Sequence, residues 1–343
     1  MGAEHMVEKM AKGALSSLDE KLVALLVAHG EIPCSGAAIG AGLGISRAAV
    51  WKHIQGLRQR GYRIEALHRR GYRLLGEPDF PSLERMQPYL TALSLLHPKQ
   101  AYFFAETDST NARASQLARD GAPEGTLCCA DAQSGGRGRM QRVWVSPAGE
   151  NLYFSVVLKP AIAPNDAAQI TLLAGLALAQ TLRDDLHIED LYLKWPNDIL
   201  IGGRKVAGIL TEMMAEPERV RYIVVGVGVN VNGRVGDMPA DLQCIATTLR
   251  ESSGRSFDRS QLLARFLDRL GYWYRQFLQG GFAPLRESWL QYGDIQGRRV
   301  RVNFYAESFT GVAESMDQNG CLLVTRDDTG ALTTVVAGDV NLL

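Results

Sequence analysis

A loop rich in glycine and arginine, Gln133–Trp144, is the segment of the sequence best suited to bind an anion. Its residues Gly135 to Arg142 comprise three glycines, three arginines, Met140 and Gln141. Glycines let the backbone approach a ligand closely, and arginines present forked donors that match phosphate and carboxylate oxygens. The loop therefore predicts binding of a nucleotide phosphate or a mixed anhydride. A disordered basic loop and an RNA-binding Gly-Arg segment are the alternative interpretations.

A second polar segment, Lys194–Asp198 (KWPND), follows an apolar strand-like run, and Lys205 begins the next one. Pro196 favours a turn, which leaves Asp198 at a strand end, where a carboxylate can hold Mg²⁺ or position an amine. Lys205 is a point charge suited to a substrate carboxylate or an α-phosphate. The alternative is an ordinary hairpin with a routine aspartate and lysine.

Two further segments carry polar or glycine-rich patterns. Thr107–Asn111 (TDSTN) follows an apolar strand, so Ser109 or Thr110 can cap the next helix, and polar groups at a helix start can also bind a ligand head group. Gly226–Gly233 (GVGVNVNG) differs from G-x-G-x-x-G, and no helical pattern follows it promptly. A dinucleotide-binding motif is therefore excluded there.

The elements that must position these segments alternate between strand-like and helical patterns, which predicts a mixed α+β or α/β domain. From Gly297 onward, short β-rich runs separated by turn residues predict a small all-β barrel. The expected strands are 101–104, 127–130, 152–158, 191–194, 206–210 and 222–229, and the expected helices are 111–119, 166–186 and 259–279.

Residues 18–75 have the pattern of three helices followed by a hairpin, with a short glycine-containing turn between the second and third helices. This order is typical of a winged helix-turn-helix. The expected bounds are a first helix capped by Ser17 or Asp19 and stopped by Gly30, a second from Ser35 to Leu43, a third from Ser46 to Gly61 and a hairpin turn at His68–Gly71.

Local charge supports nucleic-acid binding by this segment. Between Arg47 and Arg73 there are eight Lys or Arg residues and one acidic residue, which is the electrostatic pattern of phosphate binding. The predicted DNA contacts are Arg47, Lys52 and His53, which face away from the apolar stripe of the third helix, with Arg69 and Arg70 of the hairpin. A solvated basic face on an ordinary helical domain is the alternative.

The composition of the 343-residue chain sets the remaining limits. The formal net charge is zero, so no global field favours nucleic acid or membrane. The polar N-terminus lacks the apolar core of a signal peptide, and the longest apolar run, Leu172–Ala179, is too short to cross a bilayer. Five cysteines without C-x-x-C spacing predict free thiols, a reducing cytoplasm and no zinc site. Gly76–Ser82 is the expected linker.

Six segments, in this order, resemble the catalytic domain of biotin–protein ligases: DSTN, QSGGRGR, NLYFSVVL, KWPNDIL, RKVAGIL and GVGVNVN. SRAAVWKHIQGLR and RRGYRL resemble the winged helix of the bifunctional form, the biotin operon repressor. The resemblance covers residues 18–343. It implies a winged helix-turn-helix at 1–80, a mixed-sheet ligase domain of the biotin/lipoyl ligase type at 81–294 and an SH3-like β-barrel at 295–343.

The resemblance also implies roles for individual residues. Biotin-binding positions are Ser109, Thr110, Asn111, Gln133, Arg137, Gly138, Arg139 and Lys205. Nucleotide-binding positions are Arg139, Arg142, Trp144, Asn197 and Asn230. The expected catalytic residues are Lys205, Arg139, Arg142 and Asp198, with Asp198 also the candidate Mg²⁺ ligand. The family loop continues with a further glycine and more basic residues where this chain has Met140, Gln141, Arg142 and Val143, so loop mobility is expected to differ.

The implied activity is ATP-dependent formation of biotinyl-5′-AMP and transfer of biotin to a lysine of a biotin carboxyl carrier protein. The implied partners are that carrier, the operator DNA of a biotin synthesis operon and a second copy of the chain. The homodimer is expected to be favoured by bound biotinyl-5′-AMP and to form near Lys205–Leu210, and no membrane contact is expected. The alternatives are a lipoate–protein ligase and a ligand-sensing repressor without ligase activity.

Overall fold

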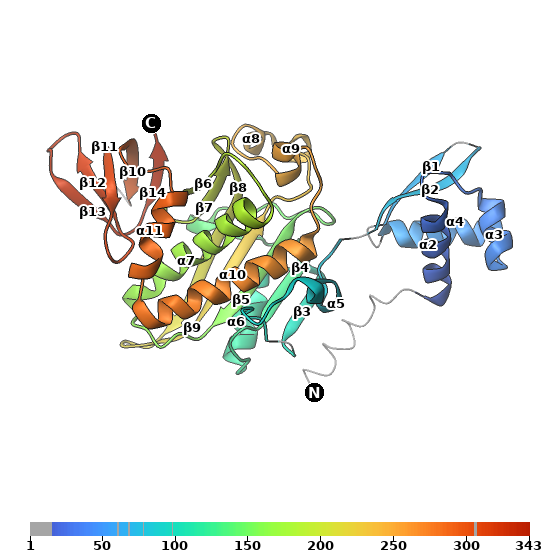
Figure 1. The fold of residues 1–343 in the computed structure, drawn as a ribbon, viewed down its shortest axis with the longest axis horizontal. Helices are drawn as coiled ribbons and strands as arrows, with labels where there is room; N and C mark the ends of the chain where they lie inside the picture. Colours follow the sequence, from blue (N-terminus) through green and yellow to red (C-terminus); the bar gives the residue numbers. More distant parts are fainter. Residues whose placement is uncertain (1–15, 60–61, 68, 78, 98, 305–306) are drawn as a thin grey trace. The chain divides into compact units, whose positions relative to one another are not determined.

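The computed structural model describes residues 16–59, 62–67, 69–77, 79–97, 99–304 and 307–343. These residues form two compact units that divide between Phe80 and Pro81. Figure 1 shows the helices and strands of both units, which are described separately below. Within the described residues, no helix is both long and apolar enough to cross a membrane.

The N-terminal unit contains three helices and a two-stranded antiparallel hairpin, as the sequence predicts. Its buried core comes from all three helices and includes Leu22, Ile39, Val50, Ile54 and Leu57. The elements are α2 (Ser17–His29), α3 (Gly36–Leu43), α4 (Arg47–Gln59), β1 (Arg63–Leu67) and β2 (Gly71–Gly76).

The helix caps of this unit correct one prediction. Ser16, rather than Ser17 or Asp19, caps α2, because its side chain accepts a hydrogen bond from the Asp19 amide at 3.1 Å. Ser35 caps α3 as predicted. The predicted helix stop at Gly61, the first residue of the predicted hairpin turn, His68, and the predicted polar N-terminus through residue 15 lie outside the described residues.

The second unit is organised around a seven-stranded sheet with the order β3-β4-β5-β9-β8-β7-β6. Only β3 and β4 pair in parallel; every other neighbouring pair is antiparallel. The strands are β3 (Ala101–Thr107), β4 (Leu127–Gln133), β5 (Leu152–Leu158), β6 (Leu191–Lys194), β7 (Asp198–Ile201), β8 (Arg204–Ala215) and β9 (Val220–Val229).

Helices cover both faces of this sheet. On one face α6 packs on a cluster that includes Cys128, Val157 and Val224. On the other face α7 and α10 cross the sheet (Figure 1), and the rings of Phe154 and Phe266 meet at 5.1 Å. The helices of this unit are α5 (Leu83–Met86), α6 (Thr110–Arg119), α7 (Ala167–Gln180), α8 (Ala240–Gln243), α9 (Leu249–Ser253), α10 (Arg259–Gly280) and α11 (Ala283–Tyr292).

The C-terminal strands form a five-stranded antiparallel sheet that packs against the rest of the second unit. The indole N–H of Trp195 donates to the carbonyl of Gly320 at 3.0 Å, and Arg286 donates to the carbonyl of Met316 at 2.7 Å. The order is β13-β12-β11-β10-β14, with β10 (Arg298–Phe304), β11 (Glu307–Met316), β12 (Leu322–Arg326), β13 (Leu332–Val335) and β14 (Asp339–Leu342).

Candidate functional site

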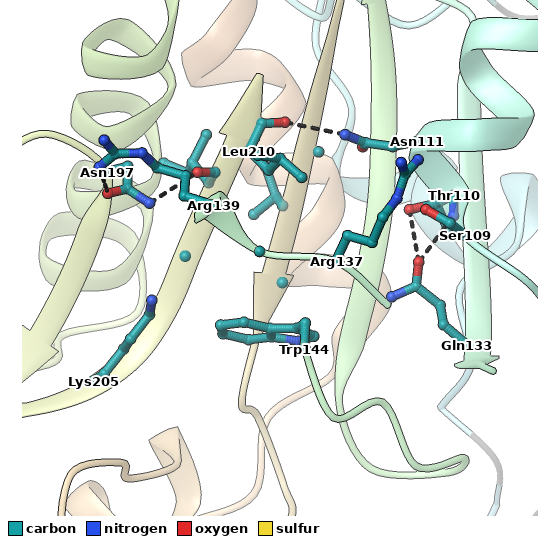
Figure 2. A pocket seen from close by; sticks show the side chains of 16 residues that line it. Ser109, Thr110, Asn111, Gln133, Arg137, Arg139, Trp144, Asn197, Lys205 and Leu210 are labelled. Atoms are coloured by element: carbon teal, nitrogen blue, oxygen red, sulfur yellow. Dashed lines mark hydrogen bonds between the residues drawn. The ribbon is translucent and has the colours of Figure 1, made fainter. Parts of the chain in front are cut away.

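One pocket collects segments that are far apart in the sequence. The start of α6, the end of β4, the Gly-Arg loop and the strands β8 and β9 all contribute to it (Figure 2). The lining residues are Ser109, Thr110, Asn111, Gln133, Arg137, Gly138, Arg139, Trp144, Asn197, Lys205, Gly208, Ile209, Leu210, Gly226, Val227 and Gly228.

At one end of the pocket, Gln133 caps helix α6 from a neighbouring strand. Its Oε1 accepts hydrogen bonds from the Thr110 amide at 2.9 Å and from Thr110 Oγ1 at 3.2 Å (Figure 2). Its Nε2 donates to Ser146 at 3.0 Å. Ser109 occupies the cap position but makes no side-chain cap bond, so its hydroxyl is not committed to the helix.

Asn111 links the end of the pocket formed by Gln133 and Thr110, here called the bonded end, to the neighbouring strands. Its Nδ2 donates to the Leu210 carbonyl at 3.2 Å and to Glu212 at 2.8 Å, and Ser155 Oγ lies 2.6 Å from its Oδ1. Glu212 Oε1 is 3.6 Å from Arg137 Nη1. Because Thr110, Asn111 and Ser155 are buried, these polar groups are fixed before any ligand arrives.

The floor of the pocket requires glycine on β9. A Cβ atom at Gly226 would lie 2.0 Å from Asn111 Oδ1, and one at Gly228 would lie 2.5 Å from the Trp144 ring. These glycines therefore allow side chains to lie directly on the strand backbone. The exclusion of a dinucleotide motif agrees with this, since Gly226 and Gly228 lie within a strand.

At the other end, C-terminal residues hold the cationic side chains. Arg139 donates to Asn197 Oδ1 at 2.8 Å and to the Gly338 carbonyl at 3.2 Å. Arg142, which is 65% exposed, pairs with Asp339. Lys194 Nζ donates to Asn341 at 2.7 Å, and burial lowers the pKa of this ammonium group.

Lys205 lies on the same side of the pocket as Asn197, opposite the Gln133 end, and beside an aromatic ring (Figure 2). Its Nζ is 2.7 Å from Asp198 Oδ1 and 5.4 Å from the centre of the Trp144 ring. Trp144 Nε1 is buried and has no hydrogen-bond partner within the described part of the chain. Residues 195–197 form a turn before Asp198 begins β7, so the predicted turn at Pro196 is confirmed.

The Gly-Arg loop has an unusual backbone where it departs from the family pattern. Met140 and Gln141 have φ values of 54° and 59°, in the left-handed region that disfavours residues with a Cβ. The Gly138 amide donates to the Arg142 carbonyl at 2.7 Å. Met140 and Val143 are 66% and 77% exposed, so no packing holds their side chains.

The pocket gathers most of the predicted site residues, but not all. Arg142, Asp198 and Asn230 do not line it. The buried Asn230 side chain donates to the Thr247 carbonyl at 3.1 Å, so it fixes a neighbouring loop. Asp198 contacts the pocket residue Lys205, and Arg142 pairs with Asp339, which does not line the pocket either.

Sequence patterns missed three contributing residues. Ser155 and Glu212 hold Asn111, and Asp339 holds Arg142. Ser155 lies inside the predicted strand 152–158, Glu212 lies beyond the predicted strand 206–210, and Asp339 lies in the segment predicted as a barrel. Their proximity to the pocket becomes visible only once the fold brings these distant segments of the chain together.

The predicted DNA contacts of the N-terminal unit differ in exposure. Arg47, Lys52, Arg69 and Arg70 are exposed. His53 departs from the expected outward orientation, because its Nδ1 lies 2.8 Å from the buried Asp19 carboxylate and its side chain is only 29% exposed.

Two other cations in this basic segment are used within the unit. Arg58 donates to the Ile64 carbonyl, and Arg73 pairs with Glu31 and Glu65. The cations available to a ligand are therefore fewer than the sequence count indicates.

Comparison with known proteins accounts for both units. Residues 103–230 match the biotin/lipoate A/B protein ligase family, and residues 19–73 match a helix-turn-helix domain. The chain is 37% identical to "Bifunctional ligase/repressor BirA" of Bacillus subtilis, over 95% of this chain and 99% of that protein. It is 33% identical to the Escherichia coli protein of the same name, over 94% and 96%.

A solved structure supports the same assignment for the second unit. The biotin protein ligase from Aquifex aeolicus in complex with biotin and ATP superposes with a TM-score of 0.61 at 29% identity. The match covers 71% of this chain and 99% of that one. The chain belongs to the biotin protein ligase family, in its bifunctional ligase/repressor branch.

Proposed function

We propose that the protein is an ATP-dependent biotin–protein ligase that also acts as a biotin-responsive transcriptional repressor. The observation that carries the ligase activity is the single pocket where the TDSTN segment, the Gly-Arg loop, Asn197 and Lys205 converge. Its bonded end suits the polar head group of biotin. Its cationic end suits the nucleotide.

In the first half-reaction, a carboxylate oxygen of biotin bonds to the α-phosphorus of ATP, and pyrophosphate leaves with the electron pair of the broken bond. We assign to Lys205 the contact with both the carboxylate and the α-phosphate. Arg139 and Arg142 hold the adenylate. Catalysis by these residues rests on positioning and on stabilisation of developing negative charge.

In the second half-reaction, the amine of a carrier-protein lysine bonds to the acyl carbon, AMP leaves with its bonding electrons, and the amine loses a proton. We assign to Asp198 the positioning of this amine. Its carboxylate is paired with Lys205 at 2.7 Å, which places it next to the residue assigned to the first half-reaction.

The residues fit Mg²⁺ only weakly. Within the described residues, no three His, Cys, Asp or Glu side chains gather into a metal site. We therefore propose that nucleotide phosphates hold most of any bound Mg²⁺, with Asp198 as a single protein ligand. The ion would neutralise charge on the departing pyrophosphate.

A direct assay separates this proposal from its alternatives. The full-length protein is supplied with ATP, Mg²⁺ and either biotin or lipoate, and acid-labile adenylate is measured. Adenylate with biotin, followed by labelling of a carrier-domain lysine, is the expected result. Adenylate only with lipoate indicates a lipoate ligase, and no adenylate with either acid indicates a sensor without enzyme activity.

For repression, we propose that biotin and ATP together raise DNA affinity by favouring a homodimer. A dimer with two-fold symmetry reads two half-sites, and coupling of about 1–3 kcal/mol is expected. Within this segment, Lys205, Ala207 and Gly208 pair with β7, and Ala207–Leu210 pair with β9, so at Ala207 and Gly208 both backbone edges are already used. Sedimentation and operator binding, with and without biotin and ATP at fixed salt, test this; unchanged mass and affinity would exclude the switch.

The remaining assignments complete the proposal. The natural acceptor is a biotin carboxyl carrier protein, and the operator belongs to a biotin synthesis operon. Five free cysteines are consistent with a protein that functions in the reducing cytoplasm. We retain 1–80, 81–294 and 295–343 as proposed domain limits.

A further inference from the structure

Helix α4 of the N-terminal unit has a large apolar side chain on its outer surface. Trp51 is 58% exposed, whereas Val50, Ile54 and Leu57 of the same helix are fully buried. An exposed tryptophan keeps a large apolar area in water, and this area is available to a ligand.

The neighbours of Trp51 define what can cover it. Ala48, Trp51, Lys52 and Gln55 are spaced i, i+3, i+4 and i+7, so they share one side of α4. Ala48 and Lys52 are exposed, and Gln55 is partly exposed. The helix contains no acidic residue, and the small Ala48 leaves Trp51 open to approach from that side.

The combination of a cationic and an aromatic group matches the major groove of duplex DNA. Phosphates flank the groove and attract lysine and arginine. Within the groove, the C5-methyl group of thymine is the apolar feature that a side chain can contact. Trp51 is the fifth residue of α4, in the N-terminal half of the helix that recognition helices direct toward base edges.

We propose that Trp51 determines operator specificity by packing against a thymine C5-methyl group in the major groove. This inference rests on the proposed repressor function. A second protein copy is a poorer occupant, because the same surface would bury the charge of Lys52. In DNA the ammonium group of Lys52 instead meets a phosphate.

The test uses full-length protein with biotin and ATP and a library of random 40-base-pair duplexes. Duplexes are selected with the wild type, Trp51→Phe, Trp51→Ala and the matched control Ile32→Ala, which removes a 71% exposed apolar side chain away from α4. The thymines of the selected duplex are then replaced, one at a time, by uracil, which lacks only the methyl group.

We expect one uracil position per half-site to weaken wild-type binding about three- to five-fold, with Trp51→Phe retaining most of this effect. Trp51→Ala should lose the same preference, bind that position equally with thymine or uracil, and keep the wild-type salt dependence. Lys52→Ala should instead reduce the salt dependence.

Equal uracil effects in the wild type and Trp51→Ala would overturn the inference while leaving the repressor function intact. So would a change in ligase rate or dimer mass with Trp51→Ala, because Trp51 would then contact protein. Failure of the wild type to select any duplex would instead contradict the repressor function, and this inference with it.

Discussion

The two ends of the pocket are held in different ways. At the α6 end, Thr110 bonds to Gln133, Ser155 bonds to both Thr110 and Asn111, and most of these groups are buried. At the loop end, Arg139 and Arg142 extend from a loop whose apolar side chains are exposed, and they rest on the C-terminal residues Gly338 and Asp339.

This difference indicates that the two ends of the pocket have different roles in ligand binding. A buried and mutually bonded set of polar groups has little freedom to lose when a ligand binds. An exposed loop held by a few ionic contacts can exchange Asp339 for a phosphate at small cost, because exposed ion pairs contribute little. We therefore expect changes at the α6 end to act on folding and biotin affinity, and changes in the loop to act on the nucleotide.

The largest effect is expected at Lys205. Lys205→Met removes the cation that lies beside Asp198 and Trp144, so biotin-dependent pyrophosphate release should fall by about 100- to 1,000-fold. Arg204→Met, one residue earlier and exposed, is the matched control and should retain activity. A Lys205 variant with near-normal turnover would remove this residue from the chemistry.

Next in size is a change at the bonded end. Gly226→Ala places a Cβ 2.0 Å from Asn111 Oδ1, so Asn111 must leave its bonds to Leu210 and Glu212. We expect a loss of about 2–3 kcal/mol in unfolding free energy, measured by denaturant titration, and weaker biotin binding.

The control for this prediction is Gly236→Ala, where a Cβ meets nothing within 4 Å. This variant should keep wild-type stability. If both glycine variants bind biotin as the wild type does, the bonded end does not form the biotin site.

A smaller effect is expected in the loop. Arg139→Gly should leave the free energy of unfolding almost unchanged. It should weaken binding of the adenylate by about 2 kcal/mol. The weaker binding is measured as faster release of biotinyl-5′-AMP, detected by biotin transfer to bystander lysines. Arg219→Gly, on the surface, is the control. Retention of the intermediate for as long as in the wild type would contradict the assigned role.

The smallest effect concerns the loop backbone. Gln141 has a φ of 59°, which costs a residue with a Cβ roughly 1 kcal/mol. Gln141→Gly should therefore raise the melting temperature by about 1–3 °C, whereas Gln141→Ala should not. A lower melting temperature for the glycine variant would show that loop entropy outweighs the strain.

The local parts of this picture follow from sequence patterns. Periodic apolar residues predict α4 and α10, and the Gly-Arg loop stands out by composition alone. The four-residue strand β7 is missed because turn residues surround it on both sides, at Pro196 and Gly202. Helix α11 is missed although Pro284 suits a helix start, because only Leu285 and Trp289 of its residues are buried and the apolar periodicity is weak.

Contacts between distant residues lie beyond such patterns. Gln133 caps a helix that begins 23 residues earlier, and Asp339 meets an arginine 197 residues away. Asp19 draws His53 toward the core, although helical periodicity alone predicts an outward ring. Each of these depends on how the chain packs, which periodicity does not encode.

The bond from Trp195 to Gly320 affects how such a gene can be rearranged. Gly320 also lies against Leu172 and Phe282, where a Cβ would approach Leu172 within 2.4 Å. A gene that ended near codon 295 would encode a protein in which the Trp195 indole N–H has lost its acceptor. The apolar side chains of Leu172 and Phe282 would become exposed to solvent. A C-terminal sheet taken from another protein would have to present a turn that accepts the Trp195 bond and packs on Leu172 and Phe282, so we expect the two sheets to be exchangeable only together.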